Sequence, residues 1–350
     1  MADSTQQAAQ AQRTYRAVCF DLDGTLLPMD TEEFLNNYYA ALARFMISEG
    51  VEGTSFKEAL NAGIRAMCHH KDSRLNSSVY WDEFYRQIDE LAKGSEDKSQ
   101  VEWLGLFTRF YETIFGQVGG QVVPDANMVE AVAVLREKGY PLALLTMPLF
   151  PLRAVEWRLQ WAGIPKESFG RITTYENSTA VKPRLQYYAE NLAALGCAGQ
   201  DVLMVGNNTV EDVVFGQLGA HVYLVTDHLL DPVGFDLSQV EHGTTAQFLQ
   251  LVRQLPPCEN PVREIHAQPV EAAQAKRAYD ENLVATEEQL ARAHEHEKAS
   301  HGLTDKAGEA AQAAAASVAA AAGRGAAAGE AVAAGAAVTA EGAAAAAGEN

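Results

Sequence analysis

Short apolar runs alternate with amphipathic stretches along much of the chain. Residues 16–20 (RAVCF) and 141–146 (PLALLT) are nearly continuous apolar runs, which is typical of strands buried on both faces of a sheet. Between such runs, apolar residues recur at the spacing of helices that bury one side. The predicted strands are the runs RAVCF, PLALLT, GRITTY, DVLMVG and HVYLVT. Strands that alternate with helices predict a parallel sheet covered by helices on both faces.

Residues 31–116 have a different pattern, because they contain amphipathic stretches but no strand-like runs. The stretch TEEFLNNYYAALARFM opens this block, with Thr31 as the expected N-cap, and about four or five helices are expected in all. Glycines and a proline in residues 116–126 end the block, and helix and strand alternate after them. Since residues 16–20 belong to the sheet by composition, the helical block is an insertion after the first strand.

Both ends of the chain differ from its middle. Residues from about 258 onward are charged and helix-prone without a strong apolar face. From about Asp305 the chain is mostly alanine with glycine, and the glycines oppose a stable helix. We therefore expect an α/β fold with a Rossmann-like parallel sheet core, an inserted all-helical domain and a low-complexity C-terminal tail. The expected parts are a disordered leader (1–14), the α/β core (15–30 and 118–256), the helical insertion (31–117), a charged helical extension (257–304) and an Ala/Gly-rich disordered tail (305–350).

Composition narrows the range of partners. The 350 residues carry a formal net charge of −19, which argues against binding to nucleic acid or to an anionic membrane surface. A small phosphorylated ligand is still compatible, because one or two local positive charges can hold it. The N-terminus has no apolar signal segment and the four cysteines form no CxxC pair, so we expect a cytoplasmic protein with free thiols. The sequence indicates no particular protein partner for the C-terminal tail.

Polar side chains lie where several of the predicted strands end. In FDLDGTLLPMD, two carboxylates flank Leu22 directly after the first strand. Ligands bind at the carboxyl ends of parallel strands, so these side chains are expected to meet at one edge of the sheet. The side chains delivered there are Asp21, Asp23, Thr146, Lys182, Asn207, Glu211 and Asp212.

This set of side chains suits phosphoryl transfer. Two adjacent carboxylates repel each other unless a cation or a shared proton lies between them, and magnesium prefers oxygen ligands. Such ligands are available from Asp21, Asp23 (backbone carbonyl), Asn207 and Asp212. One carboxylate can attack phosphorus, and a second can exchange protons with the leaving group and with water. Thr146 and Lys182 can hold the phosphoryl oxygens.

Four short motifs occur in a fixed order, and each follows a predicted strand: DLDGT, LLT, KP and GNNTVED. In this order they make the chain similar to the haloacid dehalogenase-like hydrolase superfamily. The motifs lie within residues 16–225, and the helical insertion resembles the helical C1-type cap that closes over the site in known members. The resemblance implies a cap-and-core enzyme with Mg²⁺ as cofactor and a small phosphorylated metabolite as substrate.

The resemblance implies a role for each motif residue. Asp21 would be the nucleophile and a magnesium ligand, and Asp23 the general acid and base that also offers its carbonyl to the metal. Thr146 would bind the phosphoryl oxygens, Lys182 would stabilise the charged intermediate, and Asp212 would anchor the metal directly or through water. Dehalogenase and phosphonatase members lack the second acid. The expected activity is a magnesium-dependent phosphatase that hydrolyses a small phosphomonoester through an aspartyl-phosphate intermediate.

Two positions depart from the family pattern. Asn207 stands where an aspartate is usual, so weaker magnesium binding is expected, partly offset by Glu211 or Asp212. Met147 stands where asparagine is common, which matters less because its backbone N–H is still available. Two alternatives stay open: a phosphomutase of the same superfamily, and a catalytically weakened binding or regulatory protein.

Residues 69–84 of the insertion are polar and then aromatic, so a substrate could contact them. The candidate residues there are Lys71, Arg74, Asn76 and Trp81. The other interpretation is a surface loop, with Asn76 or Ser77 capping a helix and Trp81 in the core of the insertion.

Overall fold

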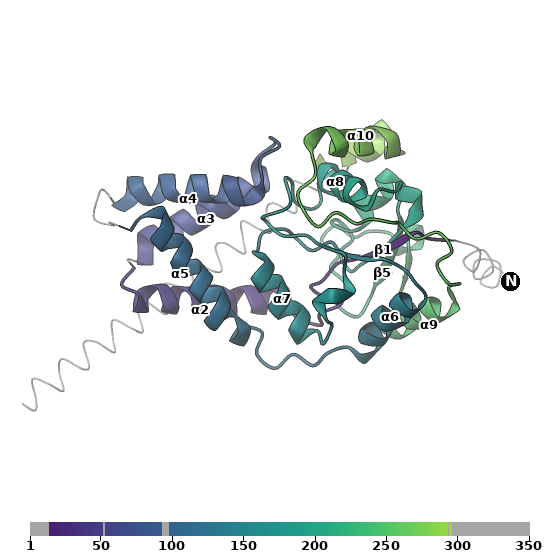
Figure 1. The fold of residues 1–350 in the computed structure, drawn as a ribbon, viewed down its shortest axis with the longest axis horizontal. Coiled ribbons are helices and arrows are strands. Elements are labelled where there is room, and N and C mark those ends of the chain that lie inside the picture. The colour runs from purple at the N-terminus through teal and green to yellow at the C-terminus, as the bar shows by residue number, and fades with distance from the viewer. Residues whose placement is uncertain (1–13, 52, 93–97, 293, 296–350) are drawn as a thin grey trace, which may run out of the picture.

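The computed structural model describes residues 14–51, 53–92, 98–292 and 294–295, and a sheet of six parallel strands lies at its centre. The strand order is β3-β2-β1-β4-β5-β6 (Figure 1). The strands are β1 (Ala17–Phe20), β2 (Leu142–Leu144), β3 (Arg171–Ile172), β4 (Val202–Gly206), β5 (His221–Val225) and β6 (Glu241–Gly243). This topology confirms the α/β fold with a Rossmann-like parallel sheet. The hydrophobic pattern misses β6, because its sequence EHG contains no apolar run.

Helices cover both faces of the sheet. On one face, α6 (Ala126–Glu137) and α9 (Thr245–Gln254) pack side by side (Figure 1). On the other face lies α8 (Leu185–Leu195). Phe20 belongs to the core under α6 and α9, and Cys19 belongs to the core under α8. Neighbouring residues of one strand therefore point to opposite faces, as the near-continuous apolar run predicts.

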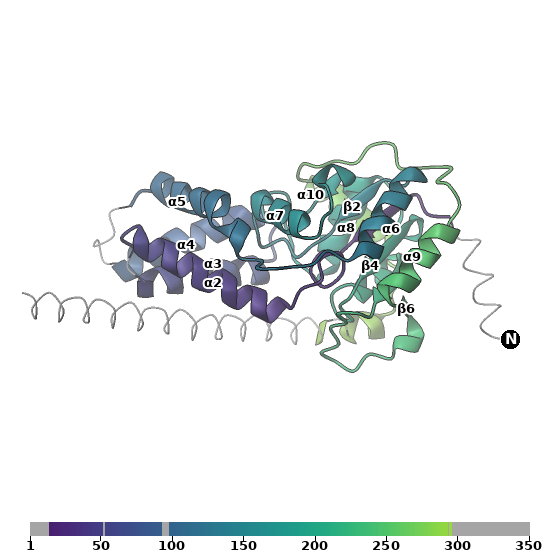
Figure 2. The same ribbon diagram turned by 90° about the horizontal axis from the view of Figure 1, so that it is seen from below.

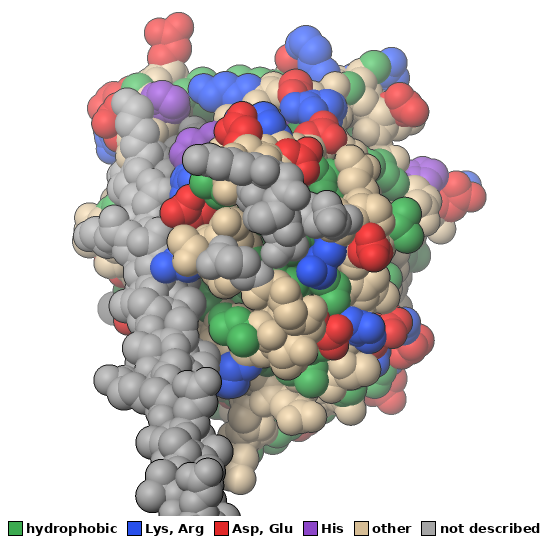
Figure 3. Space-filling view, turned by 90° about the vertical axis from the view of Figure 1, so that its left-hand side faces the viewer, with side chains coloured by type: hydrophobic (Ala, Val, Ile, Leu, Met, Phe, Trp, Pro, Cys, Tyr) green, Lys and Arg blue, Asp and Glu red, His purple; other side chains and the backbone are tan. Residues whose placement is uncertain are grey.

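The helical insertion lies between β1 and β2 and has its own aromatic core (Figure 2). Phe84, Phe110 and Phe115 are fully buried within it. The core helix α7 (Leu152–Trp161) packs against both parts of the molecule, because its apolar residues divide between the core of the sheet and the core of the insertion. The helices of the insertion are α2 (Thr31–Ser48), α3 (Gly53–His69), α4 (Asn76–Ala92) and α5 (Gln100–Thr113). Figure 3 views the insertion from its outer end, where acidic and basic side chains are interspersed.

One local prediction, the N-cap at Thr31, is wrong. Asp30, not Thr31, is the N-cap of α2, and its carboxylate accepts a hydrogen bond of 2.8 Å from the backbone N–H of Glu33. An aspartate at this position also interacts favourably with the helix dipole. The stretch VEDVVFGQLG forms the 3₁₀ helix η4 (Val213–Leu218), and Gly219 ends it with a φ of +87°. The other 3₁₀ segments are η1 (Phe115–Gln117), η2 (Lys166–Ser168), η3 (Gly199–Asp201) and η5 (Leu237–Gln239).

The charged extension contacts the core more closely than its composition predicts. Its helix α10 (Ala272–Asn282) packs against α8, and Ala278 joins the core on that face of the sheet (Figure 1). The segment before α10 is held by Arg171, which is 1% exposed and donates hydrogen bonds of 2.7 and 3.1 Å to the carbonyls of His266 and Gln268. The sequence indicates no strong apolar face in this region. In the structure, alanine and tyrosine side chains pack it against the core.

The predicted leader, apart from residue 14, and the predicted tail (305–350) lie outside the described residues. Within the part of the chain that the structure describes, none of the helices combines the length and the apolar character needed to cross a membrane.

The docking of the extension can be tested by truncation. A chain that ends at residue 259 leaves the buried Arg171 without its carbonyl acceptors at His266 and Gln268. Hydrogen bonds to a charged group contribute about 1.5–3 kcal/mol each, so the thermal midpoint should fall by roughly 5–15 °C. The control is a chain that ends at Glu295 and keeps every described contact. Equal thermal midpoints for the two chains, measured by circular dichroism, would contradict a stabilising role for the extension.

Candidate active site

The loop after β1 places both carboxylates of the first motif. Asp21 continues the strand, since its backbone N–H donates to the carbonyl of Val205 on β4 at 2.8 Å. Leu22 and Leu26 are fully buried and fasten the turn to the core under α6 and α9. Gly24 adopts a φ of +80°, and a Cβ there would lie 2.2 Å from Nδ2 of Asn207. The glycine thus allows the first and fourth motifs to lie in contact.

Next to this loop, Asp21, Lys182 and Asp212 form a buried triad of charged side chains. Nζ of Lys182, which precedes α8, lies 2.7 Å from Oδ1 of Asp21 and 2.7 Å from Oδ1 of Asp212. Burial raises the pKa of Asp21 to about 7, although Lys182 opposes the shift. Burial acts to lower the pKa of Lys182, but the two carboxylates outweigh it and raise that pKa well above its ordinary value. The triad therefore keeps the lysine charged beside Asp21.

Asp212 is held by three donors. Besides Lys182, the backbone N–H groups of Asn207 and Asn208 donate to its Oδ2 at 3.0 Å each. A Cβ on residue 206 would lie 2.1 Å from the same oxygen, so only Gly206 leaves room for this approach. The carboxylate of Asp212 is fully buried, and its hydrogen bonds to these two N–H groups fix the loop after β4.

The amide of Asn207 is oriented by two partners. Its Nδ2 donates to the backbone carbonyl of His228 at 2.6 Å, and its Oδ1 accepts from the hydroxyl of Thr25 at 3.2 Å. The same hydroxyl lies 3.3 Å from Oδ2 of Asp21. Oδ1 of Asn207 and Oδ2 of Asp21 therefore share the hydroxyl of Thr25 at the end of the sheet.

These oxygens fit a hard cation such as Mg²⁺, which takes carboxylate, amide and backbone carbonyl ligands. Among the described residues, no cluster of three or more His, Cys, Asp or Glu side chains could hold a metal by itself. A magnesium site at this point would therefore depend on the amide oxygen of Asn207 and on the backbone carbonyl of Asp23 as well as on Asp21. Glu211 is half-buried beside the same cavity, and burial raises its pKa to about 7.

Thr146 has a hydroxyl group available for an oxygen ligand. Its side chain is 1% exposed, and Oγ1 has no hydrogen-bond partner among the described residues. The backbone carbonyl of Thr146 is fixed, because the hydroxyls of Thr173 and Tyr187 both donate to it at 2.9 Å. A buried donor without a partner is costly, so the position is suited to a group that arrives with a ligand.

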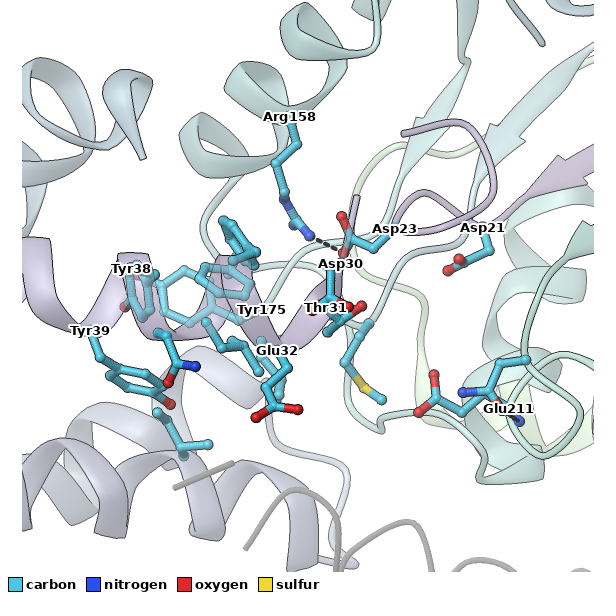
Figure 4. Close-up of a pocket in the computed structure, with 18 of the residues that line it drawn as sticks. Asp21, Asp23, Asp30, Thr31, Glu32, Tyr38, Tyr39, Arg158, Tyr175 and Glu211 are labelled. Carbon is cyan, nitrogen blue, oxygen red and sulfur yellow. Dashed lines mark hydrogen bonds and ion pairs between the residues drawn. The ribbon is translucent and has the colours of Figure 1, made fainter. Parts of the chain in front are cut away.

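Arg158 is the site residue that the sequence analysis missed. It lies on α7, is 1% exposed, and Nη1 donates to Oδ2 of Asp23 (Figure 4). The guanidinium also lies over the ring of Phe150, 4.9 Å from its centroid. The sequence contains a signal, since Arg158 occupies an inward position of α7 between the buried Val155 and Leu159. A charged residue on the buried side of a helix needs a partner, and Asp23 is that partner.

A cavity of about 670 Å³ connects these residues with the insertion. Figure 4 shows Asp21, Asp23 and Glu211 at its core end, with Tyr38 and Tyr39 on the insertion side. Of the four candidates in residues 69–84, Trp81 lines the cavity. The other three lie elsewhere: Lys71 and Arg74 are exposed, and Asn76 is buried where it donates to the carbonyls of Pro148 and Ala180.

Comparison with known proteins finds a family that matches this chain. The family model described as haloacid dehalogenase-like hydrolase matches residues 15–218. A glyceraldehyde 3-phosphate phosphatase from Methanothermobacter thermautotrophicus is 26% identical over 200 residues, which cover 57% of this chain and 80% of that protein.

Two solved structures are similar over much of the chain. A 2-haloacid dehalogenase from Pseudomonas syringae pv. Tomato is 14% identical with a TM-score of 0.46, and a predicted phosphoglycolate phosphatase from Haemophilus somnus is 16% identical with a TM-score of 0.42. Each match covers 69% of this chain and 99% of the other.

The partner of Asn207 generates a prediction about its replacement. Asn207→Asp removes the donor to the carbonyl of His228 and places a carboxylate oxygen against it, so the metal-free protein should lose about 1–3 kcal/mol of stability. Asn208→Asp is the matched control, because Oδ1 of Asn208 only accepts from the N–H groups of Val210 and Glu211. Urea unfolding in the presence of a chelator measures the difference. Equal midpoints for both variants would contradict a structural role for the amide.

The Arg158–Asp23 pair generates a second prediction. Asp23→Asn leaves a charged arginine buried without its carboxylate, so stability should fall by about 3 kcal/mol. Asp21→Asn should cost less than about 1 kcal/mol, since Lys182 keeps Asp212. The double variant Asp23→Asn/Arg158→Met should recover most of the loss. A double variant as unstable as the Asp23→Asn single variant in urea unfolding would count against the pair.

Proposed function

The chain belongs to the haloacid dehalogenase-like hydrolase family, and from this premise we propose that it is a magnesium-dependent phosphatase that hydrolyses a phosphomonoester through an aspartyl-phosphate on Asp21. The observation that carries the proposal is the buried ammonium of Lys182, held at 2.7 Å from both Asp21 and Asp212 at the core end of a cavity. The relative named glyceraldehyde 3-phosphate phosphatase favours a phosphatase activity over other hydrolase activities of the family.

In the proposed first step, Asp21 attacks phosphorus. Lys182 holds Oδ1 of this carboxylate at 2.7 Å, whereas Oδ2 accepts only a longer bond of 3.3 Å from Thr25, so Oδ2 is the more available oxygen for the new P–O bond. The bond from phosphorus to the alcohol oxygen of the substrate breaks as the new bond forms. Thr146 donates its unpaired hydroxyl to a phosphoryl oxygen, and the charge of Lys182 reduces the repulsion between the nucleophile and the phosphate.

Asp23 moves the protons in both steps. Arg158 holds Oδ2 of Asp23 and leaves Oδ1 without a partner among the described residues, so Oδ1 is the oxygen that exchanges the proton. In the first step Asp23 gives a proton to the departing alcohol oxygen. In the second it takes a proton from the water that attacks phosphorus, which releases phosphate and restores the carboxylate of Asp21.

Magnesium, when bound, would neutralise charge on the phosphoryl oxygens and on the nucleophile. The residues that would hold it are Asp21, Asp23 through its backbone carbonyl, Asn207, and Asp212 directly or through water. The hydrogen bond from Nδ2 of Asn207 to His228 keeps Oδ1 of the amide turned toward Asp21, which supports its use as a ligand.

The test is phosphate release from a panel of phosphomonoesters that includes 4-nitrophenyl phosphate, glyceraldehyde 3-phosphate and phosphoglycolate. The wild-type protein should release phosphate with magnesium and stop when a chelator removes it. Asp21→Asn should reduce kcat by at least about a thousandfold, because the nucleophile is lost. The folded state of this variant is checked by circular dichroism.

Two outcomes would contradict the proposal. Equal inactivity of the wild-type protein and Asp21→Asn across the panel would favour a binding or regulatory protein. Rearrangement of a sugar phosphate without release of phosphate would favour a phosphomutase.

A further inference from the structure

The cavity above Asp21 has apolar walls. From the insertion, Leu35, Tyr39, Ile64 and Trp81 line it while remaining half-buried, so they present carbon surface to whatever occupies the space. Leu149 and Phe150 continue this surface on the core side. Apolar surface of this kind stabilises a ligand in proportion to the apolar area that it covers.

Some of the polar groups in these walls are engaged, and the buried hydroxyl of Tyr80 is one that has no partner among the described residues. The hydroxyls of Tyr38 and Tyr111 form a hydrogen bond of 2.9 Å with each other. A polyol such as a sugar needs a partner for each hydroxyl that it buries, and these residues offer few.

Among the described residues that line the cavity, no unpaired cation is available for a second anionic group on the substrate. Arg158 is the one Lys or Arg among the described residues that line it. Its charge is paired with Asp23 and its guanidinium lies over Phe150, while Nε and Nη2 are buried without a hydrogen-bond partner among the described residues. Asp30 and Glu32 add negative charge to the lining at the start of α2 (Figure 4). A carboxylate or second phosphate on the substrate would therefore meet an excess of negative charge, with only the two unpartnered N–H groups of Arg158 to offset it.

We propose that the organic group of the substrate is large and apolar and carries no second negative charge. This inference rests on the phosphatase reaction proposed above, and it narrows that reaction to alkyl or aryl phosphomonoesters. The volume of about 670 Å³ falls within the range of pockets that bind drug-sized molecules and greatly exceeds the needs of a three-carbon phosphate.

Matched substrates test each part of the proposal. Glycerol 3-phosphate and n-propyl phosphate share a three-carbon chain, and n-hexyl phosphate extends it by three methylenes. We expect kcat/KM to rise from the first to the last, by up to about fourfold for each buried methylene. Phenyl phosphate should exceed 4-carboxyphenyl phosphate at least about tenfold, although the carboxylated phenol is the better leaving group. A preference for glycerol 3-phosphate or for the carboxylated ester would overturn the proposal.

Substitutions in the wall provide a second test. Leu35→Lys should lower kcat/KM for n-hexyl phosphate and raise it for 4-carboxyphenyl phosphate, because it places a cation in the apolar wall. Leu35→Gln should lower the first without raising the second. Leu104→Lys is the matched control on α5, where the leucine is 49% exposed and lies outside the cavity lining, and it should change neither value. An unaltered substrate preference in Leu35→Lys would contradict the assignment of this wall to the substrate.

A binding measurement separates this inference from the proposed reaction. If no phosphomonoester is turned over, the phosphatase proposal fails, and calorimetry with the full chain then decides the inference alone. Binding of n-hexyl phosphate at least about tenfold tighter than that of glycerol 3-phosphate would sustain it. Equal binding of the two, or binding of neither, would overturn it.

Discussion

The rest of the site depends on the buried ammonium of Lys182 between Asp21 and Asp212. Through this one group, the end of β1, the loop after β4 and the segment before α8 meet at a single point. The arrangement is stable only because each charge has a partner at hydrogen-bond distance, since an uncompensated buried ion costs several kcal/mol. Two carboxylates against one ammonium leave an excess of negative charge, which a cation at the same edge of the sheet would neutralise.

The cavity joins two kinds of surface that come from different parts of the chain. The core supplies carboxylates, an amide and a threonine hydroxyl at the ends of its strands, where backbone groups and short side chains can be placed accurately. The insertion supplies leucine, isoleucine and aromatic side chains from helices whose other faces form its aromatic core. Under the proposed function, reactivity and substrate choice would belong to separate elements, and Arg158 on α7 lies where the two surfaces meet.

The strand pattern predicted the sheet and placed Asp21, Lys182 and Asp212 at one edge of it, because parallel topology alone brings strand ends together. It could not predict β6, whose pairing comes from its neighbour β5 and not from apolar residues of its own. It also missed Arg158, because the partner of a buried charge is set by tertiary packing. The strand pattern also did not predict the docking of α10, because Ala278 becomes a core residue only when α8 lies beside it. The orientation of the Asn207 amide depends on His228, a residue from another loop.

The position of β1 in the middle of the sheet has a consequence for biosynthesis. Phe20 pairs with Leu144 on one side and Val205 on the other, so the strand that leads to Asp21 is made first and must wait for partners that lie far along the chain. The insertion, in contrast, builds most of its core from residues that lie between β1 and β2 in the sequence. During synthesis, the helices that line the cavity can therefore fold locally before β1 is paired, as expected when local contacts form faster than distant ones.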